Sequence, residues 1–172
     1  MGFWLHVDID YPDHDKESLP RFVHWGSSVL LQAFAQGRFF PEGAPSPLDK
    51  VAKKLGIDVS PLQKVSGGDF NLCFEGIDPE DKVAWAKAEQ EKQQAEREHE
   101  ANWQNPAHLV ACIRTLMKAL DAHPNIFTEV DISTDYYKAF YLSGLFRKEL
   151  DELLRIIEWA EARNFRVRLK LV

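Results

Sequence analysis

The segment HVDIDYPDHD, residues 6–15, brings two histidines and four aspartates into ten positions. Imidazole nitrogens and carboxylate oxygens are common ligands of metal ions in proteins. His6, Asp8 and Asp10 alternate with apolar residues, so an extended chain would place all three on one face. The segment could therefore contribute to a metal site or to phosphoryl transfer.

Two known motifs can be compared with this segment. A calcium loop that begins at Asp8 would place Pro12, Asp13 and Leu19 where the loop needs an oxygen donor, a glycine and a glutamate. The stretch VDID resembles the first motif of haloacid-dehalogenase-type phosphatases, which implies that Asp8 attacks phosphorus, Asp10 transfers the leaving-group proton and magnesium neutralises charge. That family has Thr or Val where Pro12 stands, and no paired-aspartate motif follows downstream. The calcium loop is excluded, and the phosphatase resemblance is incomplete.

A metal site of another kind would need ligands from several segments. Same-face residues on one strand lie ~7 Å apart, so His6, Asp8 and Asp10 cannot surround one ion alone. The other histidines that could contribute form no recognised metal-binding spacing: His14, His24, His99, His108 and His123. We therefore predict no divalent-metal site and no cofactor.

A structural role explains the same acidic residues. Arg166, Arg168 and Lys170 follow one another at the same two-residue spacing in the last segment of the chain. If the two segments are neighbouring strands, each pair of opposite charges across them contributes ~0.2–1 kcal/mol to the pairing. We expect this arrangement for Asp8 and Asp10, with Arg166, Arg168 and Lys170 exposed to solvent.

Patterns typical of a catalytic nucleophile are missing. The stretch HWGSS places Ser27 after Gly26, but inside a segment whose apolar pattern predicts a helix rather than a strand-to-helix turn. The stretch SGGD lacks the lysine of a phosphate-binding loop. The sequence therefore favours a protein without enzymatic activity, and a metal-dependent hydrolase or phosphatase using His6, Asp8 and Asp10 is the alternative.

Composition indicates one globular domain over residues 1–172. The content of 45% hydrophobic and 28% charged residues is that of a folded protein. A net charge of −6 argues against nucleic-acid binding, which needs clustered lysine and arginine. Cys73 and Cys112 are distant from each other and lie in apolar runs, as expected for buried thiols in a reducing cytoplasm. No apolar run approaches the ~20 residues that span a bilayer, so we expect a soluble, cytoplasmic protein.

The periodicity of apolar residues predicts an α+β fold. Period-two alternation indicates strands at both ends of the chain, each with one polar face, whereas parallel strands covered on both sides are apolar throughout. We expect a small mixed β-sheet of three to five strands packed against helices, with a long polar helix around 79–103. The other expected elements are helices over 19–36, 47–55, 106–123 and 144–163, a hairpin over 62–75, a short strand over 125–131 and a helical turn over 133–144.

The core is expected on the most periodic helices. Helix 144–163 should bury Phe146, Leu150, Leu153, Leu154, Ile157 and Ala160. Helix 106–123 should bury Leu109, Ile113, Leu116, Met117 and Leu120.

Two stretches could form surfaces for a partner. The polar helix has eight acidic and four basic residues between Asp78 and Trp103, so Glu96 and Glu100 could attract a basic protein. Alternatively it is a solvated helix with Trp85 and Trp103 anchoring its ends.

The second stretch, TDYYKAFYLSG, is rich in tyrosine. Tyr136, Tyr137 and Tyr141 could bind a partner protein, because tyrosine contributes contact area at little entropic cost. Alternatively, two or three of these rings pack on the core.

Three functional hypotheses remain open. The preferred one is a non-enzymatic binding protein that recognises another macromolecule, for example an inhibitor of a basic protein, in the way of immunity proteins and antitoxins. The others are the metal-dependent hydrolase and a structural subunit in which the polar helix bridges neighbours in an assembly.

Overall fold

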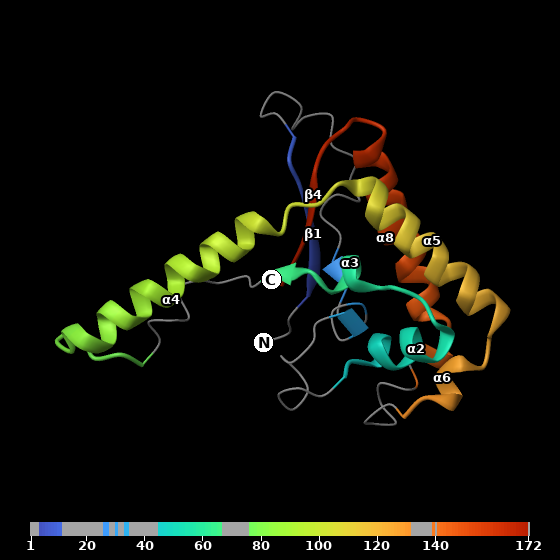
Figure 1. Ribbon diagram of the computed structural model, residues 1–172, viewed down its shortest axis with the longest axis horizontal. Coiled ribbons are helices and arrows are strands. Elements are labelled where there is room, and N and C mark those ends of the chain that lie inside the picture. Colours follow the sequence, from blue (N-terminus) through green and yellow to red (C-terminus); the bar gives the residue numbers. More distant parts are fainter. Residues whose placement is uncertain are drawn as a thin grey trace.

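The computed structural model describes residues 4–11, 26–27, 30, 33–34, 45–66, 76–131, 139 and 141–171. Within these ranges the chain forms a four-stranded sheet with helices packed on it, so the predicted α+β class is confirmed (Figure 1). The elements are β1 Leu5–Ile9, β2 Gly26–Ser27, α2 Pro47–Leu55, α3 Ser60–Gln63, β3 Val65–Ser66, α4 Lys82–Ala101, α5 Pro106–Ala122, α6 Ile126–Glu129, α8 Leu145–Glu161 and β4 Val167–Leu171.

The sheet is mixed and has the strand order β2-β1-β4-β3. β1 runs antiparallel to both β2 and β4, and β3 runs parallel to β4. The two longest strands, one from each end of the chain, therefore form its centre. Their register places Leu5 opposite Leu171 and Val7 opposite Leu169.

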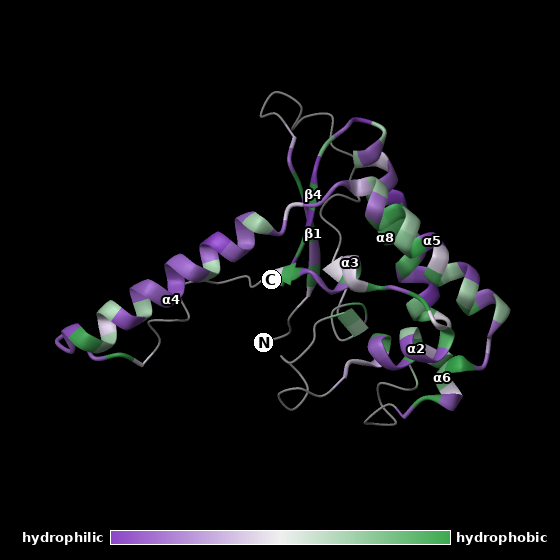
Figure 2. Cartoon of the chain, viewed as in Figure 1, coloured by the Kyte–Doolittle hydropathy of each residue, from purple (hydrophilic) through white to green (hydrophobic). Residues whose placement is uncertain are grey.

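One face of the sheet carries the core. The odd-numbered residues of β1 and β4 point into it, and α5 and α8 pack against that face (Figure 1). Apolar side chains are frequent on these two helices, whereas α4 is largely hydrophilic (Figure 2). The buried residues predicted for α5 are confirmed, as are those of α8 except Leu154, which is only partly buried; Ile156 is buried instead.

Several helix ends match the sequence signals. Ser46 caps α2 by accepting from Asp49 N, while the Asp49 carboxylate accepts from Ser46 N at 2.8 Å. Gly56, with φ of 65°, ends that helix in the left-handed conformation. Asn105 caps α5 by accepting a hydrogen bond from Ala107 N. The long polar helix begins at Lys82 rather than 79, because Asp81 is its N-cap and accepts from Val83 N and Ala84 N.

The strand predicted over 125–131 is wrong. Residues Ile126–Glu129 form the helical turn α6. Ile126 and Phe127 are adjacent and both buried, which a helical turn permits, whereas a strand would direct them to opposite faces.

The helix predicted over 19–36 is wrong at Gly26 and Ser27, which form β2. Helical residues follow at Leu30, Ala33 and Phe34. The Ser27 hydroxyl accepts a hydrogen bond from Leu30 N at 2.9 Å, as a helix-capping serine does. Ser27 therefore lies between a strand and a helix, but it is fully buried and its oxygen supports that turn.

The hairpin predicted over 62–75 is wrong in its first strand. Leu62 and Gln63 belong to α3, and only Val65–Ser66 is extended, pairing with β4 in parallel. The predicted second strand, at 70–75, lies outside the described residues.

Candidate functional site

Asp8 on β1 and Asp10 just after it lie opposite Arg168 on β4 and Arg166 just before it, on the polar face of the sheet. Arg168 Nη2 is 3.0 Å from Asp8 Oδ2, and Lys170 Nζ is 2.8 Å from Asp8 Oδ1. Arg166 Nη2 is 2.6 Å from Asp10 Oδ2. The predicted pairing of two charged neighbouring strands is confirmed.

The ion pairs differ in their exposure. Asp10 and Arg166 are 45% and 60% exposed, and a pair so open to water contributes about 0–1 kcal/mol. The Arg168 side chain is only 8% exposed, so the prediction that it faces solvent is wrong. The physical reason is that α4 and Trp103 lie over it. Removing the partner of a charge that is buried this deeply costs more stability than removing the partner of an exposed charge.

Arg168 joins three elements of the fold. Besides Asp8 on β1, its Nη1 donates to Glu100 Oε1 and to the carbonyl oxygen of His99, both at 3.1 Å. Its guanidinium carbon lies 4.2 Å from the centroid of the Trp103 ring, a cation–π contact. We call Asp8, His99, Glu100, Trp103 and Arg168 the Arg168 junction. It attaches the C-terminal end of α4 to the sheet, and the cation is favourably placed at a helix C-terminus.

Two histidines lie at the polar face of the sheet, His6 on β1 and His99 on α4. His6 is opposite Gly26, and burial, followed by the charge of Lys170, lowers the pKa of its imidazole. His99 Nδ1 lies 2.8 Å from the hydroxyl of Ser66, and burial, followed by the charge of Arg168, lowers the pKa of its imidazole. Both rings therefore favour the neutral form.

The contact between Ser66 and His99 joins β3 to α4. Ser66 is 5% exposed, and its hydroxyl donates to Leu169 O at 3.2 Å. Which of the two groups donates in the contact between Ser66 and His99 depends on the tautomer of the imidazole. Through these two contacts Ser66 links β3, β4 and α4.

The metal-site alternative can be compared with this geometry. His6, Asp8 and Asp10 do share one face, as predicted. The carboxylates of Asp8 and Asp10 are bonded to lysine or arginine. Among the residues that the structure describes, no group of three or more His, Cys, Asp or Glu side chains could hold a metal ion. In the described part of the chain, Asp8 and Asp10 thus belong to a face of the sheet on which acidic and basic side chains form ion pairs.

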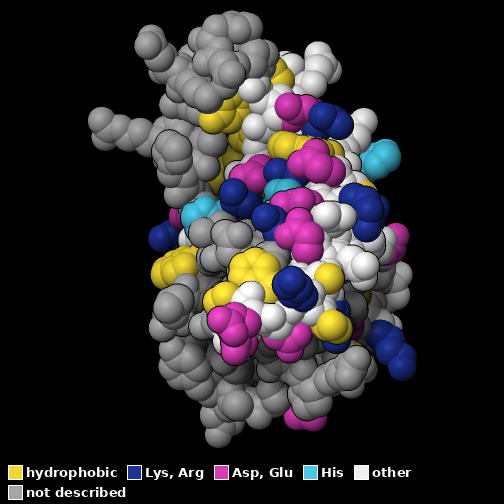
Figure 3. Space-filling model, turned by 90° about the vertical axis from the view of Figure 1, so that its left-hand side faces the viewer, with side chains coloured by type: hydrophobic (Ala, Val, Ile, Leu, Met, Phe, Trp, Pro, Cys, Tyr) yellow, Lys and Arg dark blue, Asp and Glu magenta, His cyan; other side chains and the backbone are white. Residues whose placement is uncertain are grey.

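α4 extends away from the body of the molecule (Figure 1). Of its 20 residues only Ala88 is buried, and Val83 near its N-terminus is 80% exposed. The predicted anchoring by Trp103 is confirmed, whereas Trp85 is 39% exposed. The helix itself has five acidic and four basic residues, and charges of both signs intermix on this side of the molecule (Figure 3).

The two predicted partner-binding glutamates differ. Glu96 is exposed and, with Gln93, Arg97 and Glu100, borders a shallow hollow. Glu100 also belongs to the Arg168 junction, and the hydrogen bond from Arg168 lowers the pKa of its carboxyl. Glu100 therefore already has an intramolecular role.

Of the predicted tyrosines, Tyr141 is 6% exposed. Its ring stacks on Phe127 at a centroid distance of 4.7 Å and meets Phe146 edge-on at 5.2 Å. The core-packing alternative thus describes Tyr141. Tyr136 and Tyr137 lie outside the described residues.

Cys112 is buried, as predicted, and burial raises the pKa of its thiol to about 11. Such a thiol is a poor nucleophile at neutral pH. Cys73 lies outside the described residues. No helix in the described part of the chain is both long enough and apolar enough to cross a membrane.

The sequence did not reveal that Trp103 covers Arg168, nor that Ser66 contacts His99. The only signal for the first was a tryptophan at the end of a polar helix, which indicated an anchor without naming its partner. No protein-family model, curated protein or solved structure matches this chain. The geometry of the molecule is therefore the basis on which its function is inferred.

Proposed function

We propose that the protein acts by binding a basic partner protein along one exposed edge of α4. The support is the helix itself, which buries only Ala88 among 20 residues. Isolated polar helices are marginally stable, and most helices in proteins depend on an apolar face packed on the core. Here the Arg168 junction holds one end, so a long helical surface is presented to solvent.

The observation that carries the proposal is the spacing of carboxylates on this helix. Glu89 and Glu96 are seven positions apart, two helical turns, so their carboxylates lie along one edge of the helix with the amide of Gln93 between them, and all three side chains are exposed. We call these three residues the acidic edge. Its carboxylates can pair with lysine or arginine of a partner, and such charges raise association rates more than they raise affinity.

An inhibitor is one role that fits this chemistry. A protein of net charge −6 that covers the basic surface of an enzyme or toxin would block access to it, as immunity proteins and antitoxins do. The acidic edge would then direct the approach, and apolar contacts elsewhere would set the lifetime of the complex.

Two double charge reversals on the same helix test the proposal. Glu89→Lys with Glu96→Lys removes the acidic edge. Glu91→Lys with Glu98→Lys makes the same change in net charge on the opposite side of α4, also seven positions apart. Partners captured by the wild-type protein from native extract would be identified by mass spectrometry, and their association rates measured at about 0.05 and 0.5 M salt.

The reversal on the acidic edge should slow association by about tenfold or more at low salt, and the control reversal should slow it much less. An equal effect of both variants would show that net charge alone steers the partner and that the edge is not the binding surface. If no basic protein is captured and the purified protein hydrolyses a phosphoester in a reaction that needs Asp8, the hydrolase alternative replaces this proposal.

A further inference from the structure

The contact of α4 with the sheet places an imidazole beside a buried cation. His99 is partly buried in the last turn of α4, and its Nδ1 lies 2.8 Å from the hydroxyl of Ser66 on β3. Arg168 on β4 donates to the carbonyl oxygen of His99 and to Glu100 Oε1, both at 3.1 Å. The imidazole and the guanidinium therefore lie at the same end of the same helix.

A helix C-terminus stabilises a positive charge, and Arg168 already supplies one there. The Arg168 side chain is 8% exposed and also bonds to Asp8 at 3.0 Å, so it is fixed between the helix and the sheet. A protonated His99 would add a second positive charge beside it. Because the guanidinium is buried, water and salt screen the repulsion between the two cations only weakly.

The carboxylates at this contact are already paired with cations. Four charged groups of the described residues act on His99: two that favour its protonation, Asp8 and Glu100, and two that oppose it, Arg168 and Lys170. Asp8 bonds to both Arg168 and Lys170, and Glu100 bonds to Arg168. The four charges thus balance while His99 is neutral. Burial, followed by the charge of Arg168, accordingly lowers the pKa of the imidazole.

We propose that His99 makes the attachment of α4 to the sheet sensitive to pH: the helix is held while the imidazole is neutral, and protonation weakens the contact. When the end of α4 leaves the sheet, the ring enters water away from Arg168 and recovers its ordinary pKa of 6.5. The detached form therefore takes up a proton at a higher pH than the attached form. The contribution of His99 to the attachment is complete above pH 6.5 and is lost as the pH falls from there through the lowered pKa of the attached form.

Hydrogen exchange of the whole protein measures this attachment without a partner, so the result does not depend on the proposed binding of a basic protein. Two backbone amides between α4 and α5 are the reporters: Asn102 N donates to His99 O at 3.2 Å, and Gln104 N donates to Val167 O at 2.8 Å. Their protection factors, which correct for the effect of pH on exchange itself, are measured by NMR at about pH 7.5 and 5. Between these values the wild-type protein should lose about threefold or more protection relative to His99→Asn.

His99→Asn removes the titration and keeps a polar side chain at the contact. The asparagine amide can donate to the Ser66 hydroxyl or accept from it, as an imidazole can, but it takes up no proton in this range. Glu149 titrates in the same range in both proteins, so the comparison with this variant isolates His99.

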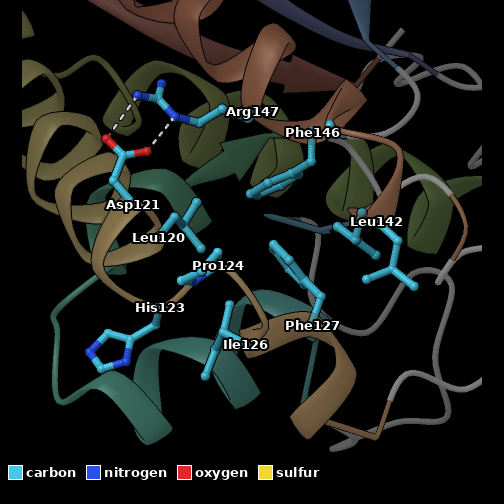
Figure 4. A pocket seen from close by; sticks show the side chains of 11 residues that line it. Leu120, Asp121, His123, Pro124, Ile126, Phe127, Leu142, Phe146 and Arg147 are labelled. Atoms are coloured by element: carbon cyan, nitrogen blue, oxygen red, sulfur yellow. Dashed lines mark hydrogen bonds and ion pairs between the residues drawn. The ribbon is translucent and has the colours of Figure 1, made fainter.

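A second histidine at a helix end serves as the control. His123 is the C-cap of α5 and is exposed at the border of a small pocket between α5, α6 and α8 (Figure 4). Figure 4 shows its ring directed away from Arg147, the arginine in that view. His123→Asn should therefore lose protection with falling pH as the wild-type protein does.

The titration of the His99 ring gives an independent measurement. The midpoint of its NMR signals should lie below pH 6.5, and Lys170→Met, which removes one of the two opposing cations, should raise it. The pH sensitivity assigned to His99 is refuted if the midpoint lies at or above 6.5, if His99→Asn loses as much protection as the wild-type protein, or if Lys170→Met leaves the midpoint unchanged. Loss of the pH dependence in His123→Asn would assign the effect to α5 and refute it as well.

Discussion

Arg168 and Asp8 face each other across β4 and β1, with Nη2 3.0 Å from Oδ2, although they are 160 positions apart in the chain. The same guanidinium lies on the Trp103 ring and bonds to the end of α4. One side chain thus connects the first strand, the last strand and the helix that projects from the sheet. Its planar shape matters, because only a fork of several donors can serve these partners together.

The first prediction concerns that shape. Arg168→Lys keeps the charge but loses the fork and the stacking on Trp103, so it should lower the free energy of unfolding by about 1–3 kcal/mol in urea melts. Arg166→Lys, in the exposed pair with Asp10, should change it by less than about 0.5 kcal/mol. Equal effects at the two positions would contradict the role assigned to Arg168.

The second prediction concerns the close approach of His6 to Gly26. A Cβ atom at position 26 would lie 2.8 Å from His6 Nε2, which is too close. Gly26→Ala should therefore force the His6 side chain to turn away and destabilise the protein by about 0.5–1.5 kcal/mol. In a His6→Ala background the same substitution should be neutral or stabilising by about 0.5 kcal/mol, because alanine has fewer conformations in the unfolded chain. A double-mutant cycle without coupling would show that the two residues do not clash.

The third prediction is a pH dependence set by Glu149. Its Oε2 is buried without a hydrogen-bond partner in the described part of the chain, and burial, followed by the charge of Glu152, raises the pKa of this carboxyl from 4.5 to about 7. Between these values the folded protein holds a proton that the unfolded chain has released. The contribution of this group therefore lowers stability as pH rises from 4.5 to about 7, and is constant above that.

Glu149→Gln removes this titration. Near pH 4.5 the variant and the wild type should be about equally stable, and near pH 8 the variant should be more stable by about 1 kcal/mol, a value reduced for partial exposure of the side chain. Thermal or urea unfolding at both pH values measures the difference. If Glu149→Gln is more stable than the wild type by the same amount at both pH values, the raised pKa assigned to Glu149 is wrong.

The fourth prediction concerns the core. Leu153 and Ile157 on α8 are fully buried, so Leu153→Ala should cost ~2–5 kcal/mol of unfolding free energy. Gln93→Ala, at an exposed position of α4, should stay within about 0.5 kcal/mol of the wild type. If neither substitution changes the free energy of unfolding in urea, the side of α8 that we assign to the core is wrong.

The fifth prediction concerns metals. Calorimetric titration with magnesium, manganese, zinc and calcium should show no saturable binding tighter than about 100 μM. The reason is that Asp8 and Asp10 already bond to Arg168, Lys170 and Arg166, which an ion would have to displace. A tight site that is lost in Asp8→Asn would refute this prediction.

Sequence reasoning succeeded where the signal is local and repeated. The period of α8, the cap residues Ser46 and Asn105, and the matched spacing of charges in β1 and β4 each predicted what the structure has. Sequence reasoning failed for the shortest elements. β2 and α6 have two and four residues, too few for a periodicity, and contacts with distant residues decide their conformation.

The candidate sites were predictable only in part. Charge spacing indicated that Asp8 would meet a basic strand, but the burial of Arg168 depends on where α4 ends and on how Trp103 turns back over the sheet. Likewise, the tyrosine-rich stretch gave no sign of whether Tyr141 faces a partner or Phe127. Both outcomes are set by packing between segments distant in sequence, which residue types alone do not specify.

The central position of β4 has a consequence for folding. β1 and β3 both pair with β4, which is synthesised after all other strands described. Until β4 leaves the ribosome, β2 is the one strand in the described part of the chain that can pair with β1, and the core face of the sheet lacks its central strand. Pairing across so long a stretch of chain is entropically costly and slows folding, and the apolar face of β1 stays uncovered by β4 until then. The sheet is completed only after translation has passed its final strand.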